Sequence, residues 1–162
     1  MDRSDEGHYI ELDFIGPERS AEVSDMAFPL LREVYRDTPS DVVESFLQRY
    51  QTPEAVAEQI AAGARYAFIL CDGECVGYLA YETDAEGMRL SKLYLLPESR
   101  GKGIGSFALG YVEDRAREAG LGSVHLEVNE ISPRTIAFYE AHGYRTAGRM
   151  EYMRIVMRKT LD

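Results

Sequence analysis

The feature that most constrains this chain is a run of three glycines in five positions, within the stretch RGKGIGS (residues 100–106). A strand-like segment, MRLSKLYLL (88–96), leads into it, and a helix-like segment, IGSFALGYVEDRAREAG (104–120), leaves it. A strand that runs through a glycine-rich turn into a helix directs several main-chain N–H groups and the positive end of the helix dipole at one small volume. Such a volume binds anions, most often phosphate, and Arg100 and Lys102 add positive charge beside it. The sequence therefore predicts an anion-binding loop between a strand and a helix.

Two common phosphate-binding loops fit this stretch poorly. The nucleoside-triphosphate loop requires G-x-x-x-x-G-K-S/T, but Lys102 is followed by Gly103. The dinucleotide fingerprint G-x-G-x-x-G follows an early strand and precedes an acidic residue about 20 positions later. Here Gly101, Gly103 and Gly105 are spaced G-x-G-x-G in the middle of the chain. The first interpretation is excluded and the second is weak.

The rest of the chain alternates between helical and strand patterns. Apolar spacing predicts helices and strands in turn, with a hairpin around Asp72-Gly73. The predicted segments are, in order, strand 8–15, helix 20–35, helical pieces 41–50 and 54–63, strands 65–71, 75–82 and 88–96, helix 104–120, strand 123–128, helix 133–142 and one or two closing strands within 144–160. A chain of 162 residues with 45 % apolar composition is expected to form a single domain over residues 1–162.

Charge and hydropathy disfavour several partners. The net charge of −10 disfavours nucleic acid, because phosphate backbones are bound by Lys and Arg. No apolar run approaches the roughly 20 residues of a membrane span, and the first residues lack the apolar core of a secretion signal. We therefore expect a cytoplasmic protein with no membrane partner. Residues 1–60 hold 14 acids against 5 arginines, whereas residues 61–162 hold 14 acids against 13 bases. The excess of acids in residues 1–60 has two interpretations: it attracts a cationic ligand, or it only keeps the protein soluble.

The two cysteines, Cys71 and Cys75, flank the predicted hairpin turn. There is no other cysteine and no histidine nearby in the sequence, so we expect no zinc site and predict no metal ligand. Both are expected to be small strand residues.

Two segments resemble one known family. Arg100, Gly103 and Gly105 satisfy the pattern Q/R-x-x-G-x-G/A, and KLYLLPESRGKGIG resembles the acyl-coenzyme A-binding segment of the GNAT superfamily of N-acetyltransferases. The segment AFYEAHGY (137–144) is similar to a helix of the same family, at the expected distance. The resemblance covers about residues 65–148.

The resemblance implies a GNAT-type α/β (α+β) fold. In this fold a mixed, strongly twisted sheet of six to seven strands is flanked by about four helices. The implied order is strand, two helices, three strands, helix, strand, helix and one or two strands. Residues 1–64 would form an acceptor-side arm, residues 65–148 an acetyl-CoA-binding core and residues 149–162 a closing strand.

The resemblance also implies the contacts of acetyl-CoA. The main chain near Leu93 and Leu95 pairs with the pantetheine amides, in a cleft where that strand and the next separate. Where the family often has Asn seven residues before the tyrosine of its helix, this chain has Ser132, and Asn129 is a substitute. The pyrophosphate is held by backbone N–H groups of Arg100, Gly101, Lys102, Gly103, Ile104, Gly105 and Ser106.

By resemblance, Tyr139 is the general acid that protonates the departing thiolate, whose pKa of about 8.5 suits a phenol donor. If Tyr139 only packed on the sheet, phenylalanine would replace it equally well. The amine must also lose a proton before it attacks the thioester. Members of the family that use a carboxylate base often carry it on the strand before the loop, but residues 88–96 contain no acid. Glu127 is the first candidate base, and His125, Glu82 or a chain of water molecules remain open.

The sequence thus predicts an acetyl-CoA-dependent N-acetyltransferase in which a primary amine attacks directly in a ternary complex. Neither cysteine has a visible base beside it, so no acyl-enzyme is expected. The predicted acceptor is a small cationic, polyamine-like amine, and a protein amino terminus or lysine is the alternative. A non-catalytic acyl-CoA-binding sensor is the alternative of another class. A homodimer through the closing strands is common in the family.

Overall fold

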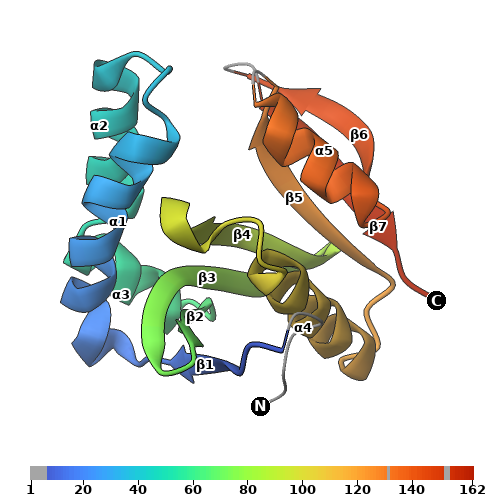
Figure 1. Cartoon of the computed structure of the whole chain (residues 1–162). Helices are drawn as coiled ribbons and strands as arrows, with labels where there is room; N and C mark the ends of the chain where they lie inside the picture. Colours follow the sequence, from blue (N-terminus) through green and yellow to red (C-terminus); the bar gives the residue numbers. More distant parts are fainter. Residues whose placement is uncertain (1–6, 131, 152–153) are drawn as a thin grey trace. The chain divides into compact units, whose positions relative to one another are not determined.

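The computed structural model describes residues 7–130, 132–151 and 154–162, and these form a mixed α/β protein (Figure 1). The strands are β1 (Ile10–Phe14), β2 (Arg65–Cys71), β3 (Glu74–Asp84), β4 (Gly87–Leu95), β5 (Ser123–Asn129), β6 (Arg145–Met150) and β7 (Arg154–Thr160). The helices are α1 (Ser20–Val34), α2 (Ser40–Tyr50), α3 (Pro53–Ala61), α4 (Ile104–Glu118) and α5 (Pro133–Ala141), with short 3-10 helices η1 (Pro17–Arg19) and η2 (Pro97–Ser99). None of the helices in these ranges is both long and apolar enough to span a bilayer.

Hydrogen bonding orders the seven strands as β1-β2-β3-β4-β5-β7-β6. The predicted mixed sheet of six to seven strands is therefore confirmed.

The chain divides into two compact units. Unit 1 is the chain up to Ala80 together with Lys92–Gly105, and unit 2 is Tyr81–Ser91 together with Ser106–Asp162. Strands β3 and β4 therefore contribute residues to both units.

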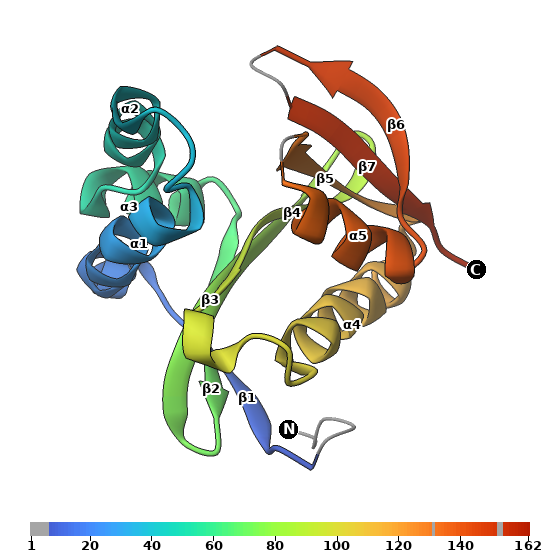
Figure 2. The ribbon, with the colours of Figure 1, turned by 45° about the horizontal axis from the view of Figure 1, so that its top comes forward.

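Unit 1 packs three helices on one face of its strands. Helices α1, α2 and α3 lie next to one another (Figures 1 and 2). Strands β1 and β2 are antiparallel, with Ile10 opposite Cys71 and Phe14 opposite Ala67. Apolar side chains three and four positions apart on the helices face the sheet, as the sequence pattern predicts. The buried cluster contains Val23, Ala27, Leu30, Leu31, Val43, Leu47, Val56, Tyr66, Phe68 and Tyr78.

A buried amide joins the α2–α3 connection to the sheet of unit 1. Gln51 has no exposed surface, and its Nε2 donates to the Tyr66 hydroxyl at 3.1 Å and to the Tyr50 carbonyl at 2.6 Å. Its Oε1 accepts from the Tyr78 hydroxyl, and Tyr66 in turn donates to Gln59 Oε1. Burial raises the pKa of Tyr78 well above its ordinary value, so this hydroxyl stays a donor. The network satisfies polar groups that would otherwise be costly to bury.

Unit 2 contains β5, β6, β7, α5 and most of α4. Strand β7 lies between β5 and β6 and is antiparallel to both. Helices α4 and α5 lie next to each other (Figure 2). Tyr144, which follows α5, donates its hydroxyl to Glu113 Oε2 on α4 at 2.9 Å, and Lys159 of β7 donates to Glu113 Oε1 at 3.0 Å. Burial raises the pKa of Tyr144 and keeps its hydroxyl protonated.

Glycine is required at one position of β3, where the main chain of β4 approaches closely. A Cβ at Gly77 would lie 2.1 Å from the Tyr94 carbonyl oxygen and 3.0 Å from Leu95 Cα. We therefore expect Gly77→Ala to lower the free energy of unfolding by about 2–3 kcal/mol, because main-chain atoms must move to make room. Urea denaturation measures this change.

Gly110→Ala, within α4, is the matched control for Gly77→Ala. No heavy atom outside the local helix backbone lies within 4 Å of a Cβ added there. Alanine in a helix interior should raise stability by about 1 kcal/mol. Equal effects of the two substitutions would contradict the close approach of β4 to Gly77.

Candidate active site

The glycine loop connects β4 to α4 through η2, as the sequence predicts. Gly101 and Gly103 have φ of +76° and +80°, in the left-handed region that glycine adopts without strain. Helix α4 begins at Ile104, immediately after the second of these residues. The first N–H groups of a helix have no acceptor within the helix, so this loop and the start of α4 present main-chain donors to an anion.

The predicted site residues fall into two groups, one in each unit. Unit 1 contains Leu93, Leu95 and the loop from Arg100 to Gly105, and unit 2 contains Ser106, Glu127, Asn129, Ser132 and Tyr139. The contacts of each group are therefore described within its own unit.

The Arg100 side chain is already bound within unit 1. Its two terminal nitrogens donate to the Glu33 carboxylate of α1 at 3.2 and 3.0 Å, and its Nε donates to the Leu95 carbonyl at 3.1 Å. This pairing lowers the pKa of Glu33. The guanidinium therefore ties the loop to α1 and β4, and its charge is balanced by Glu33. Its neighbour Lys102 is exposed.

Ser106, in the first turn of α4, contacts a histidine that the sequence analysis did not include. His142 Nδ1 donates to the Phe138 carbonyl at 2.7 Å, and its Nε2 lies 2.8 Å from the Ser106 hydroxyl. The same turn contains Ile104, whose side chain is 1 % exposed, so Ile104 has only main-chain groups to offer. No local pattern links residues 106 and 142, because their contact depends on how α4 packs against α5.

Leu93 and Leu95 are half-buried near the end of β4. In unit 2, the start of β4 is parallel to β5, with Met88 opposite Val124 and Arg89 opposite His125. In unit 1, the Leu96 N–H donates to the Val76 carbonyl at 2.8 Å, so β4 stays bound to β3 up to the loop.

Tyr139 lies in α5 and is 7 % exposed. Its ring makes edge-to-face contacts with Phe138 and Tyr144, at centroid distances of 5.1 and 5.6 Å. Ser132 precedes the helix, and its N–H donates to the Asn129 carbonyl at 3.0 Å. The Ser132 hydroxyl makes no capping hydrogen bond to the helix.

Each candidate side-chain base in unit 2 contacts a charged side chain. Glu127 lies 3.2 Å from Arg154 and 3.7 Å from Arg89, and Arg89 also binds Glu82 at 3.0 Å. His125 is buried, and its Nε2 lies 2.9 Å from Asp84 Oδ2. Its Nδ1 is buried and has no hydrogen-bond partner in the described part of the chain. Each candidate would have to leave or share such a contact in order to accept a proton.

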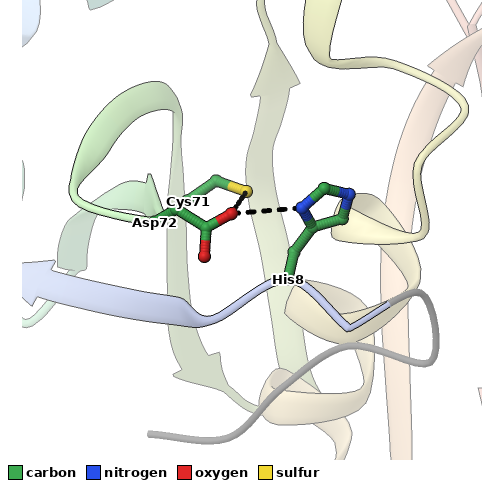
Figure 3. A group of neighbouring side chains, drawn as sticks. All are labelled: His8, Cys71 and Asp72. Atoms are coloured by element: carbon green, nitrogen blue, oxygen red, sulfur yellow. Dashed lines mark hydrogen bonds and ion pairs between the residues drawn. The ribbon is translucent and has the colours of Figure 1, made fainter.

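No histidine is near the cysteines in the sequence, but the fold brings one close to Cys71. His8, which precedes β1, lies beside Cys71 at the end of β2 and Asp72 in the following turn (Figure 3). The register of β1 with β2 brings these residues together, and the sequence does not reveal that register. Burial and the neighbouring Asp72 raise the pKa of the Cys71 thiol, although Lys102 opposes this shift.

A pocket of about 450 Å³ opens on unit 1, and none of its lining residues is a predicted site residue. Its acids are partly neutralised, because Arg19 binds both Asp13 and Glu22. The lining comprises Asp13, Arg19, Glu22, Asp25, Met26, Phe68, Leu70 and Cys75. The pocket therefore shares no lining residue with the glycine loop.

Comparison with known proteins gives a family match and several relatives. Residues 28–144 match the model of the acetyltransferase (GNAT) family. Streptothricin acetyltransferase of Streptomyces lavendulae is 29% identical over 120 residues, which are 73% of this chain and 64% of that protein. IAA acetyltransferase of Azospirillum brasilense is 35% identical over 78 residues, 47% of this chain and 51% of that protein. The chain thus matches less than two thirds of the length of either relative.

Among solved structures, the PaiA N-acetyltransferase of Thermoplasma acidophilum in complex with coenzyme A has the same fold. The TM-score is 0.83 at 19% sequence identity, and the match covers 94% of this chain and 99% of that chain. The fold class implied by the sequence resemblance is therefore confirmed.

Proposed function

The chain belongs to the acetyltransferase (GNAT) family, and from this premise we propose that it transfers the acetyl group of acetyl-CoA to a primary amine. One observation carries the proposal: the family match over residues 28–144 includes both the glycine loop and α5 with Tyr139. The coenzyme A bound to the PaiA relative supports the choice of donor. We propose that the chain acts as one domain over residues 1–162.

In the proposed complex, the pyrophosphate binds the main-chain N–H groups from Gly101 to Ser106. The positive φ of Gly101 and Gly103 supports this, because such a backbone turns successive N–H groups toward one side. The pantetheine amides pair with the main chain near Leu93 and Leu95, with Asn129 and Ser132 as further polar contacts. Arg100 binds Glu33 through its guanidinium, and its own N–H donates to the Pro97 carbonyl at 3.3 Å, so this residue holds the loop in shape and the N–H groups that follow it are the donors for the anion.

The proposed chemistry forms one C–N bond and breaks one C–S bond. A neutral amine attacks the thioester carbonyl carbon, the tetrahedral intermediate collapses, and the coenzyme leaves as a thiolate. Tyr139 gives its phenolic proton to that thiolate, and the amine nitrogen loses a proton to a base. Glu127 is the proposed base, directly or through water, and its carboxylate must share its pairing with Arg89 and Arg154 when it takes the proton.

We propose that the acceptor is a small cationic amine. The excess of acids in residues 1–60 supports this, because a negative field raises the local concentration of a cation. One relative is named streptothricin acetyltransferase, and this name supports an acceptor other than a protein. A protein amino terminus or lysine remains the alternative acceptor.

A panel of amines with acetyl-CoA tests the acceptor, with release of the free thiol as the readout. We expect polyamines to be acetylated with kcat/KM at least about tenfold above neutral amines of matched length, a difference of about 1.4 kcal/mol. The preference should shrink as salt is added, since about 1 M salt reduces the screening length to about 3 Å. A preference for neutral or anionic amines would discard the cationic acceptor.

The panel should also include peptides with a free amino terminus or lysine. Turnover of peptides alone would assign the alternative acceptor. Binding of acetyl-CoA without turnover of any amine or peptide would instead favour the non-catalytic sensor.

A further inference from the structure

Three potential metal ligands meet at one end of the β1–β2 pair in unit 1 (Figure 3). His8 precedes β1, Cys71 is the last residue of β2, and Asp72 begins the turn to β3. Strands β1 and β2 run antiparallel with Ile10 opposite Cys71, so the residue two positions before Ile10 approaches the turn. The three side chains are thus brought together by strand register, although His8 and Asp72 are 64 positions apart.

The ligand atoms lie close to the spacing that a small tetrahedral site requires. His8 Nδ1 lies 3.2 Å from Asp72 Oδ2, Cys71 Sγ lies 3.9 Å from the same oxygen, and all three atoms lie within 4.8 Å of one another. Bond lengths of about 2.0–2.3 Å at tetrahedral angles place zinc ligands about 3.3–3.6 Å apart. Small side-chain shifts are therefore enough to bring all three atoms to one ion.

The main chain holds Asp72 in the orientation that such a site needs. Its φ of +51° is left-handed, a conformation that Asp and Asn tolerate better than most residues. Its Oδ1 accepts from the Tyr9 N–H at 3.0 Å, and its N–H donates to the Tyr9 carbonyl at 2.8 Å. With Oδ1 bound in this way, Oδ2 faces His8 and Cys71.

We propose that His8 Nδ1, Cys71 Sγ and Asp72 Oδ2 bind one zinc ion, with solvent as the fourth ligand. An imidazole, a thiolate and a carboxylate form a mixed set that suits a borderline ion and suits the oxygen-preferring magnesium and calcium poorly. The ion takes the place of the thiol proton, which passes to solvent, and of the contact between His8 and Asp72. None of the three residues belongs to the proposed acetyl-CoA contacts.

The surrounding charges favour a cation on balance. Asp72 and Glu74 are the acids close enough to act on the Cys71 thiol, and Lys102 is the opposing cation. With the thiolate, three negative charges face one positive charge, so a dication completes the balance. Lys102 belongs to the glycine loop, so its charge acts on this site as well. Binding of the ion nevertheless requires no coenzyme.

Titration of the full, reduced chain with cobalt(II) tests the site directly, with coenzyme left out because its thiol and phosphates bind metal ions. We expect one equivalent of cobalt to produce the charge-transfer absorption of a cobalt–thiolate bond, and zinc to abolish it by displacement. The chain has two cysteines, which allows a matched comparison. Cys71→Ser should lose the absorption, whereas Cys75→Ser should keep it.

The other two ligands are tested by conservative variants. His8→Gln and Asp72→Asn should each weaken cobalt binding by more than about tenfold, and asparagine retains the tolerance for the left-handed turn. Circular dichroism of each variant establishes that the fold is intact. The proposal is overturned by any of three results in folded protein: no thiolate absorption at one equivalent, absorption that persists in Cys71→Ser, or unchanged affinity in both His8→Gln and Asp72→Asn.

Discussion

Gly103→Val should abolish detectable binding of acetyl-CoA, with a loss of at least about 100-fold in affinity, or about 2.7 kcal/mol. Two effects contribute. The residue has a φ of +80°, which a β-branched side chain avoids, so the loop would relax and its N–H groups would turn away from a common centre. The added side chain would also lie beside the main-chain N–H groups that are proposed to bind the pyrophosphate. Isothermal titration calorimetry with acetyl-CoA and with free coenzyme A measures the loss.

Gly120→Val is the matched control, because it imposes similar backbone strain elsewhere. Gly120 has a φ of +74°, follows α4, and has no heavy atom within 4 Å of an added Cβ. Both substitutions should cost about 1–2 kcal/mol of stability, but only Gly103→Val should lose coenzyme. If folded Gly103→Val protein bound acetyl-CoA with wild-type affinity, the loop would not be part of the acetyl-CoA site and the proposed function would be overturned. That result would not affect the zinc site proposed at His8, Cys71 and Asp72.

The strand–loop–helix segment could be predicted because its signals are local. A glycine spacing, a preceding strand pattern and a following amphipathic helix all lie within about thirty residues, and each reflects main-chain or periodicity constraints. The prediction of the strand over 88–96 and the helix from 104 agrees with β4 (Gly87–Leu95) and α4 (Ile104–Glu118). Likewise, Thr52 and Pro53 begin α3, with the Thr52 hydroxyl accepting from the Ala55 N–H, a local start signal.

Side-chain pairing could not be predicted, because it depends on packing between distant segments. The sequence predicts that Arg100 adds positive charge beside the anion loop, but it does not reveal that the guanidinium binds Glu33, 67 positions away. Similarly, Glu127 was the first candidate base on its strand position alone, and the structure pairs it with Arg89 and Arg154. His8 and Cys71 illustrate the same limit, since their proximity follows from strand register. Residue type and spacing thus indicate which chemistry is available, whereas pairing decides which of those groups are free to perform it.

Tyr139→Phe should lower turnover by about 10²–10³-fold and change coenzyme affinity by less than about threefold. The substitution removes only the hydroxyl, so the ring keeps its packing against Phe138 and Tyr144. Without a phenol, the thiolate must leave unprotonated or take its proton from water, which slows collapse of the intermediate. Turnover and binding should be measured on the same preparation, with the best amine from the panel.

Tyr144→Phe separates the acid role of Tyr139 from the general effect of losing a buried hydroxyl. Tyr144 is fully buried and donates to Glu113 at 2.9 Å, so its substitution should lower the free energy of unfolding by about 1–2 kcal/mol. Its turnover should stay within about twofold of wild type, because Glu113 keeps the contact with Lys159 and the helix keeps its position. If Tyr139→Phe behaves like Tyr144→Phe, destabilised but fully active, then Tyr139 is a packing residue. The proton for the thiolate must in that case come from water, because a tyrosine whose hydroxyl is dispensable does not act as the acid.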